Sequence, residues 1–132
     1  MKLRIQGNNL PNTLLEAVGA LANKGLLRQQ DAIYQEREGI VTFRFQRLPI
    51  AGKSVLSGTQ HSDIPIISKI TIRNVLSCGI EDTGQCEVIT ILFGISFKDN
   101  EIFLSSAEER SGVTCYNLKC SVSGIDIEIV DE

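Results

Sequence analysis

The chain has 132 residues, of which 42% are hydrophobic and 22% are charged, and its net charge is −3. This length and composition are typical of one globular domain with its own core, so we expect residues 1–132 to form a single domain. The acidic balance disfavours nucleic-acid binding, because nucleic-acid binders gain affinity by neutralising phosphates with Lys and Arg. The lack of Trp and the 5% aromatic content also disfavour a surface on which bases stack.

The N-terminal residues contain no apolar run as long as that of a signal peptide. No other segment approaches the ~18 consecutive apolar residues of a membrane span. We therefore expect a soluble, cytoplasmic protein that binds no membrane, with its four cysteines reduced.

The first part of the chain predicts a strand and then a helix. Apolar and polar residues alternate over residues 2–6, which indicates a half-buried strand. Thr13 and Glu16 have the spacing of a capping box, and the apolar residues over 14–24 follow the period of an amphipathic helix. We expect Gly25 to take the left-handed position that ends this helix.

The rest of the chain predicts extended structure. We expect strands over 41–48, 69–73, 87–97, 102–104, 113–122 and 125–129. Residues 29–32 are compatible with a helical turn, whereas 33–34 favour a strand, and of these two alternatives we favour a strand over 32–37. Turns are expected at residues 82–84 and at Asp99-Asn100, because Asp and Asn tolerate left-handed backbone angles. Residues 52–65 are predicted to form one long loop. The fold class that follows is α+β, with one N-terminal amphipathic helix packed against a mostly antiparallel, curled sheet of about six to seven strands.

Residues Gly52-Lys53-Ser54 match the tail of a phosphate-binding loop. Arg47 occupies the position where that motif requires its first glycine, and no helical pattern follows Ser54. We therefore expect no nucleotide and no other cofactor.

The four cysteines are poorly spaced for a zinc site. Seven residues separate Cys78 from Cys86 and four separate Cys115 from Cys120, whereas structural zinc sites usually draw paired ligands from a tight turn. We expect no metal and interpret most of the cysteines as small buried apolar residues, with a disulfide across either pair as the alternative.

His61 is the only histidine, and it lies beside Ser62 and Asp63 in the predicted 52–65 loop. Neighbouring residues in a loop do not orient an imidazole for catalysis, so we predict no catalytic residues. Lys53, His61 and Asp63 remain candidates for binding from this loop.

Two predicted strands carry a cationic polar side. Thr42 and Arg44 lie on the polar side of the 41–48 strand, and Lys69, Thr71 and Arg73 form the polar side of the 69–73 strand. If the strands are neighbours, three cations share one open sheet face that suits a small anion or an acidic partner. The alternative is that these residues only solubilise the sheet and protect its edges.

We therefore expect a non-enzymatic binding or protein-interaction module that uses this face or an edge strand. Its partner would be another protein or a second copy of the chain in a homo-oligomer. The alternative is a small-ligand-binding protein or an enzyme, with a pocket between helix and sheet that the 52–65 loop gates.

Overall fold

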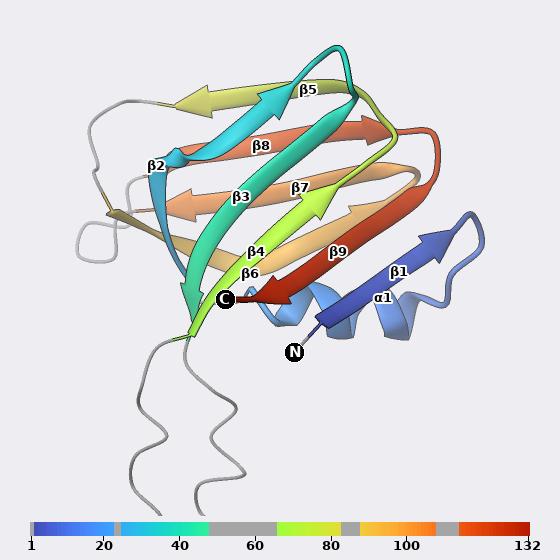
Figure 1. Ribbon diagram of the computed structural model, residues 1–132, viewed down its shortest axis with the longest axis horizontal. Coiled ribbons are helices and arrows are strands. Elements are labelled where there is room, and N and C mark those ends of the chain that lie inside the picture. Colours follow the sequence, from blue (N-terminus) through green and yellow to red (C-terminus); the bar gives the residue numbers. More distant parts are fainter. Residues whose placement is uncertain (1, 23–24, 48–65, 83–87, 108–113) are drawn as a thin grey trace, which may run out of the picture.

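The computed structural model describes residues 2–22, 25–47, 66–82, 88–107 and 114–132. Within these ranges the chain forms one helix and nine strands (Figure 1). Their bounds are β1 (Lys2–Gly7), α1 (Asn12–Ala20), β2 (Leu26–Gln35), β3 (Ile40–Arg47), β4 (Ile66–Ile72), β5 (Val75–Asp82), β6 (Val88–Lys98), β7 (Glu101–Ala107), β8 (Thr114–Val122) and β9 (Ile125–Asp131).

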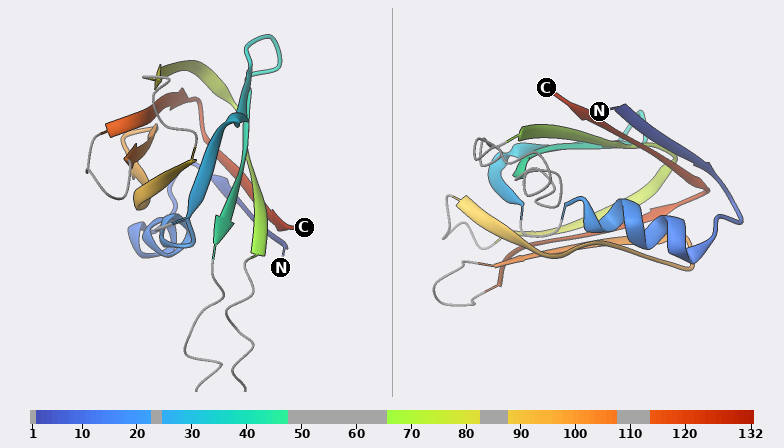
Figure 2. Two further views of the ribbon diagram at one scale, coloured as in Figure 1. Left: turned by 90° about the vertical axis from the view of Figure 1, so that its left-hand side faces the viewer. Right: turned by 90° about the horizontal axis from the view of Figure 1, so that it is seen from below.

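The strands are hydrogen-bonded in the order β1-β9-β4-β3-β2-β6-β7-β8-β5, and each neighbouring pair is antiparallel. The start of β2 pairs with both β3 and β6, and a register shift follows Leu27. The strands on either side of β2 therefore form two layers that face each other (Figure 2). Helix α1 packs on β6 at the lower side of the view in Figure 1.

The chain crosses between the two layers at two short corners. One corner joins β4 to β5 through Arg73 and Asn74, and the other joins β8 to β9 through Ser123 and Gly124. The Ser123 backbone N–H donates to the Asn74 carbonyl at 3.0 Å, and the Arg73 N–H donates to the Asp126 carbonyl at 2.9 Å. These hydrogen bonds hold the corners together, which fixes one layer against the other.

Alternate side chains of the strands fill the space between the layers. Val41, Phe43 and Phe45 of β3 are at most 1% exposed, and Ile70 and Ile72 of β4 are buried beside them. The alternation predicted for these two strands is confirmed. The outward residues of the same strands are consequently the ones available for binding.

A helix is present where one was predicted, but it covers Asn12–Ala20 and not residues 14–24. It begins after Pro11, whose carbonyl accepts hydrogen bonds from the backbone N–H groups of Leu14 and Leu15. Pro11 occupies the N-cap, where its missing backbone N–H removes no hydrogen bond of the helix. In the described residues no side chain caps the helix, so the predicted capping box of Thr13 and Glu16 is wrong.

The C-terminal end of the helix also differs from the prediction. Leu21 is the C-cap, so Gly25 is not the residue that ends α1. The helix also follows β1 and is therefore internal rather than N-terminal.

The prediction of a mostly antiparallel sheet with one helix is confirmed, whereas the predicted number and arrangement of strands are wrong. The nine strands form two layers instead of one curled sheet of six to seven. Strand β5 was not predicted. The tight turn predicted at Asp99-Asn100 is confirmed, since both residues have positive φ, 51° and 60°. The predicted 52–65 loop and most of the predicted 82–84 turn lie outside the described residues.

Candidate functional site

Strands β3 and β4 are neighbours, in a register that brings the predicted binding residues together. Arg44 lies opposite Lys69, and Thr42 lies opposite Thr71. These four residues alternate with the buried residues of the same strands, so their side chains lie on the outer side of the layer. Arg73 follows the end of β4 on the same side.

The row that contains Arg44 and Lys69 continues over two more strands. Lys69 lies opposite Val130 of β9, and Val130 lies opposite Lys2 of β1. Three cations therefore align across the outer side of β3, β4, β9 and β1, a surface that we call the basic face.

The basic face carries more cations than carboxylates. Its charged side chains are those of Lys2, Arg4, Arg44, Lys69, Arg73, Asp126, Glu128 and Glu132. Five cations against three carboxylates give an excess of two positive charges, on a chain whose net charge is −3. The surface is thus locally basic on an acidic protein.

Arg44 and Lys69 are weakly neutralised by their surroundings. The Arg44 Nε lies 3.0 Å from the Glu132 Oε1, but both side chains are about half exposed, and such pairs contribute little stability. Among the described residues no carboxylate pairs with Lys69. Two like charges directly opposite each other destabilise a strand pair. The repulsion between Arg44 and Lys69 is therefore only partly offset by Glu132.

Arg73 has a different environment from the other two predicted cations. Its Nη2 lies 3.4 Å from the Glu128 Oε1 and its Nη1 lies 3.9 Å from the Asp126 Oδ1. Asp126 is buried and accepts two hydrogen bonds of 3.1 Å from Arg4 and one of 3.1 Å from Gln6. The hydrogen bonds from Arg4 are the main reason that the pKa of Asp126 lies below its ordinary value. Arg73 thus belongs to a cluster of ion pairs around the buried Asp126 carboxylate at the end of the basic face.

A second polar cluster, which the sequence reasoning missed, lies on the inner side of the same layer. The buried Arg47 donates from Nε to the Ser68 Oγ at 3.0 Å and from Nη2 to both Asp131 oxygens at 3.0 and 2.8 Å. The Ser68 hydroxyl donates to the Asp131 Oδ1 at 2.6 Å. Burial raises the pKa of Asp131, but the hydrogen bonds from Ser68 and Arg47 outweigh it, so the pKa is lowered.

The strand period could have revealed this cluster. Arg47 is in phase with Phe43 and Phe45, and Asp131 is in phase with the isoleucines of β9. Ser68 is fully buried, so a substrate cannot reach its hydroxyl. The cluster therefore joins the ends of β3, β4 and β9 and has no catalytic geometry.

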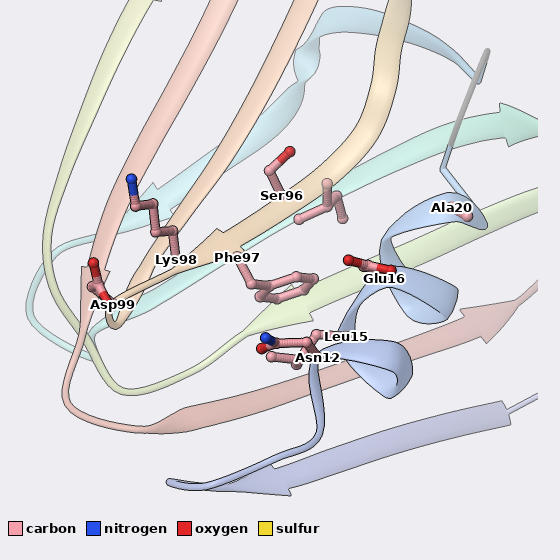
Figure 3. Close-up of a pocket in the computed structure, with 9 residues that line it drawn as sticks. Asn12, Leu15, Glu16, Ala20, Ser96, Phe97, Lys98 and Asp99 are labelled. Carbon is pink, nitrogen blue, oxygen red and sulfur yellow. The ribbon is translucent and has the colours of Figure 1, made fainter.

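A cavity of about 540 Å³ lies between α1 and the end of β6 (Figure 3). Asn12 and Leu15 come from α1, and the ring of Phe97 extends toward them from β6. Lys98 and Asp99 lie at the hairpin end and make that side polar. A neighbouring cavity of about 460 Å³ shares these five residues. The size of the first cavity suits a small organic ligand.

Three predicted candidates, Lys53, His61 and Asp63, lie outside the described residues, and so does the proposed gate over 52–65. Within the described ranges, no three His, Cys, Asp or Glu side chains are grouped to hold a metal ion. The described part of the chain also contains no helix of the length and apolarity that a membrane span requires.

Comparison of the chain with models of protein families, with curated proteins and with solved structures found no match.

Proposed function

We propose that the protein is a non-enzymatic binding module whose basic face binds an acidic segment of another protein. The observation that carries this proposal is the direct opposition of Arg44 and Lys69 on neighbouring strands. A carboxylate-rich partner can neutralise both of these opposed cations, of which Glu132 pairs with Arg44 alone.

The spread of the cations favours a peptide segment over a small anion. Neighbouring strands lie ~4.8 Å apart, so Arg44 on β3 and Lys2 on β1 are separated by roughly 14 Å across the row. One small anion cannot contact both ends of that row, whereas successive acidic residues of an extended chain can.

Exposed apolar residues beside the cations favour a protein partner over a nucleic acid. Ile67 of β4 is 48% exposed and Ile33 of β2 is 56% exposed, and both lie on the outer side of the layer. A protein segment can bury these side chains, which the phosphate backbone of a nucleic acid does not do.

The direct test is the binding of a fluorescent oligo-glutamate peptide, followed by anisotropy at low ionic strength. Arg44→Gln/Lys69→Gln should weaken the affinity by roughly tenfold or more, because the variant removes both opposed cations. Salt at about 0.5 M should weaken wild-type binding, since exposed charges are screened.

The matched control is Lys98→Gln/Lys119→Gln, which makes the same change of net charge at exposed cations on β6 and β8. This control should bind the peptide as the wild type does. Equal losses in the two variants would show that only net charge matters and would contradict the proposal. Stronger binding of an oligonucleotide than of the peptide would contradict an acidic protein as the partner and would indicate a nucleic acid. Self-association through the same residues would indicate a second copy of the chain.

A second candidate function is binding of a small organic ligand in the cavity between α1 and β6. The observation that favours it is a volume of about 540 Å³ with both apolar and polar lining. A ligand that copurifies should be seen by native mass spectrometry and should be lost on Asn12→Trp, which places a large ring between α1 and Phe97. Ser105→Trp, at an exposed serine of the adjacent strand β7, should retain it. Retention in both variants would exclude this cavity as the binding site.

A further inference from the structure

Two cysteines face each other across the β5–β8 strand pair. Cys78 and Cys120 are directly opposite in the register, and their sulfur atoms lie 3.2 Å apart. Directly opposite residues of antiparallel strands have Cα separations of about 4.5 or 5.5 Å, and both values lie within the range of disulfides. A bond between the two sulfurs therefore needs little movement of the backbone.

The two sulfurs differ in their access to solvent. Strand β5 ends the hydrogen-bonded order, so β8 is its only strand neighbour in the described structure. Cys78 on this edge strand is half-buried, whereas Cys120 on β8 is fully buried beside Ile102 of β7. A reagent from solution can thus reach Cys78 first.

The hydrogen bond between the sulfurs also makes them chemically unequal. The Cys120 thiol donates to the Cys78 sulfur, which lowers the pKa of Cys78 and raises that of Cys120. The thiolate is the nucleophile in disulfide exchange. Cys78 is therefore the sulfur that attacks a disulfide from solution. Cys120 is then placed to attack the mixed disulfide that forms on Cys78.

We propose that Cys78 and Cys120 form a redox-active dithiol that a small disulfide of the oxidised-glutathione class converts into a cross-strand disulfide. The Cys78 thiolate attacks one sulfur of the small disulfide, whose S–S bond breaks and releases one small thiolate. Cys120 then gives its proton to that thiolate and attacks the Cys78 sulfur, which releases the second small thiolate. The second small thiolate takes up a proton from water, which replaces the proton that Cys78 released when it ionised. The protein thus loses two electrons and two protons, and the small disulfide becomes two thiols.

This site is independent of the proposed binding function. The basic face lies on the layer of β1, β9, β4 and β3, whereas the dithiol lies between β5 and β8 of the other layer. A disulfide there would tie the edge strand β5 covalently to its neighbour. Oxidation would thus restrain β5 at the edge of the second layer and would leave the basic face on the first layer unchanged.

The test treats the full chain with oxidised glutathione and maps its peptides without reduction. The Cys86→Ser/Cys115→Ser variant removes the other two cysteines and should still lose two hydrogen atoms in mass, with Cys78 linked to Cys120. Its thermal midpoint should rise by about 5–10 °C on oxidation and return on reduction, because the cross-link constrains the unfolded chain.

Single variants test the order of the two steps. Cys120→Ser should stop at a glutathione adduct on Cys78, whereas Cys78→Ser should give no adduct on the buried Cys120 in the native state. A peptide map that joins another pair of cysteines, or a Cys86→Ser/Cys115→Ser variant that stays reduced in excess oxidised glutathione, would overturn the proposal. That double variant retains Cys78 and Cys120, so the map decides even if Cys120→Ser does not fold.

Discussion

Two arginines of the same strand show how the position of a residue in a strand decides its role. Arg44 of β3 points outward, and its side chain is 54% exposed. Arg47, three residues later on β3, points inward, and its side chain is 8% exposed. The outward arginine is available to a partner from solution, whereas the inward one is held by Ser68 and Asp131.

This difference predicts unequal costs of substitution. Arg47→Gln should lower the free energy of unfolding by roughly 3 kcal/mol, because it removes the buried guanidinium that donates to both Asp131 oxygens and to Ser68. Arg44→Gln should change it by no more than about 0.5 kcal/mol, as is usual at exposed positions. Urea denaturation of the two variants measures both values. Equal costs would contradict the assignment of Arg47 to the interior.

A pH prediction follows from Asp126. Its pKa is depressed in the folded protein, mainly by the hydrogen bonds from Arg4. A depressed carboxyl pKa gives stability that is complete above the ordinary value of 3.8 and is lost as the pH falls through the folded pKa. The loss of stability as the pH falls below 3.8 should therefore be smaller in Asp126→Asn than in the wild type. If the unfolding free energies of Asp126→Asn and the wild type fell in parallel as the pH is lowered, Asp126 would make no such contribution to stability.

Among the elements, helix α1 is short and makes a very close contact with the sheet. Val18 and Gly19 are its buried residues, and the backbone of Gly19 approaches the Ile95 carbonyl of β6. A Cβ atom at Gly19 would overlap with that carbonyl oxygen. The absence of a side chain at this position is what lets α1 lie against β6.

Gly19→Ala should therefore destabilise the protein. Gly→Ala within a helix normally gains up to about 1 kcal/mol from propensity, but here the added Cβ must push α1 away from β6. We expect a net loss of roughly 1–3 kcal/mol in chemical denaturation. Thr13→Ala is the comparison and should change stability by less than about 0.5 kcal/mol, because Thr13 does not cap α1. A gain in stability for Gly19→Ala would mean that α1 does not pack closely on β6.

Some elements could be predicted from the sequence and others could not, for identifiable reasons. Strands β3 and β4 alternate cleanly because one face of each is buried. Strand β5 was missed because a register shift between Val75 and Ser77 disrupts its alternation, and its Ser-Cys-Gly sequence is typical of a turn. The start of α1 was placed too late because the Thr13–Glu16 spacing was given more weight than Pro11.

The candidate site was only partly predictable. The outward positions of Arg44 and Lys69 follow from the period of two strands. The opposition of Cys78 and Cys120 does not, because it depends on a pairing between residues 42 positions apart. The pairing of β9 with both β1 and β4 likewise joins distant parts of the chain. Local patterns therefore identify faces, and only the topology shows which faces meet.

In the whole molecule, the basic face and the Cys78–Cys120 pair lie on separate layers. The outer side of β3, β4, β9 and β1 has a local excess of positive charge, although the chain as a whole is acidic. Because opposite charges attract at long range, such a surface can orient an acidic partner before contact. We therefore expect the position of these cations, and not the net charge of the protein, to determine binding.

Charge reversal at two pairs of sites tests this claim most directly. Arg44→Glu/Lys69→Glu and Lys98→Glu/Lys119→Glu have identical net charges and differ only in the layer that is changed. Binding of the oligo-glutamate peptide should disappear in the first variant and remain close to that of the wild type in the second. Similar affinities of the two variants for the peptide would contradict the assignment of the basic face as the binding surface.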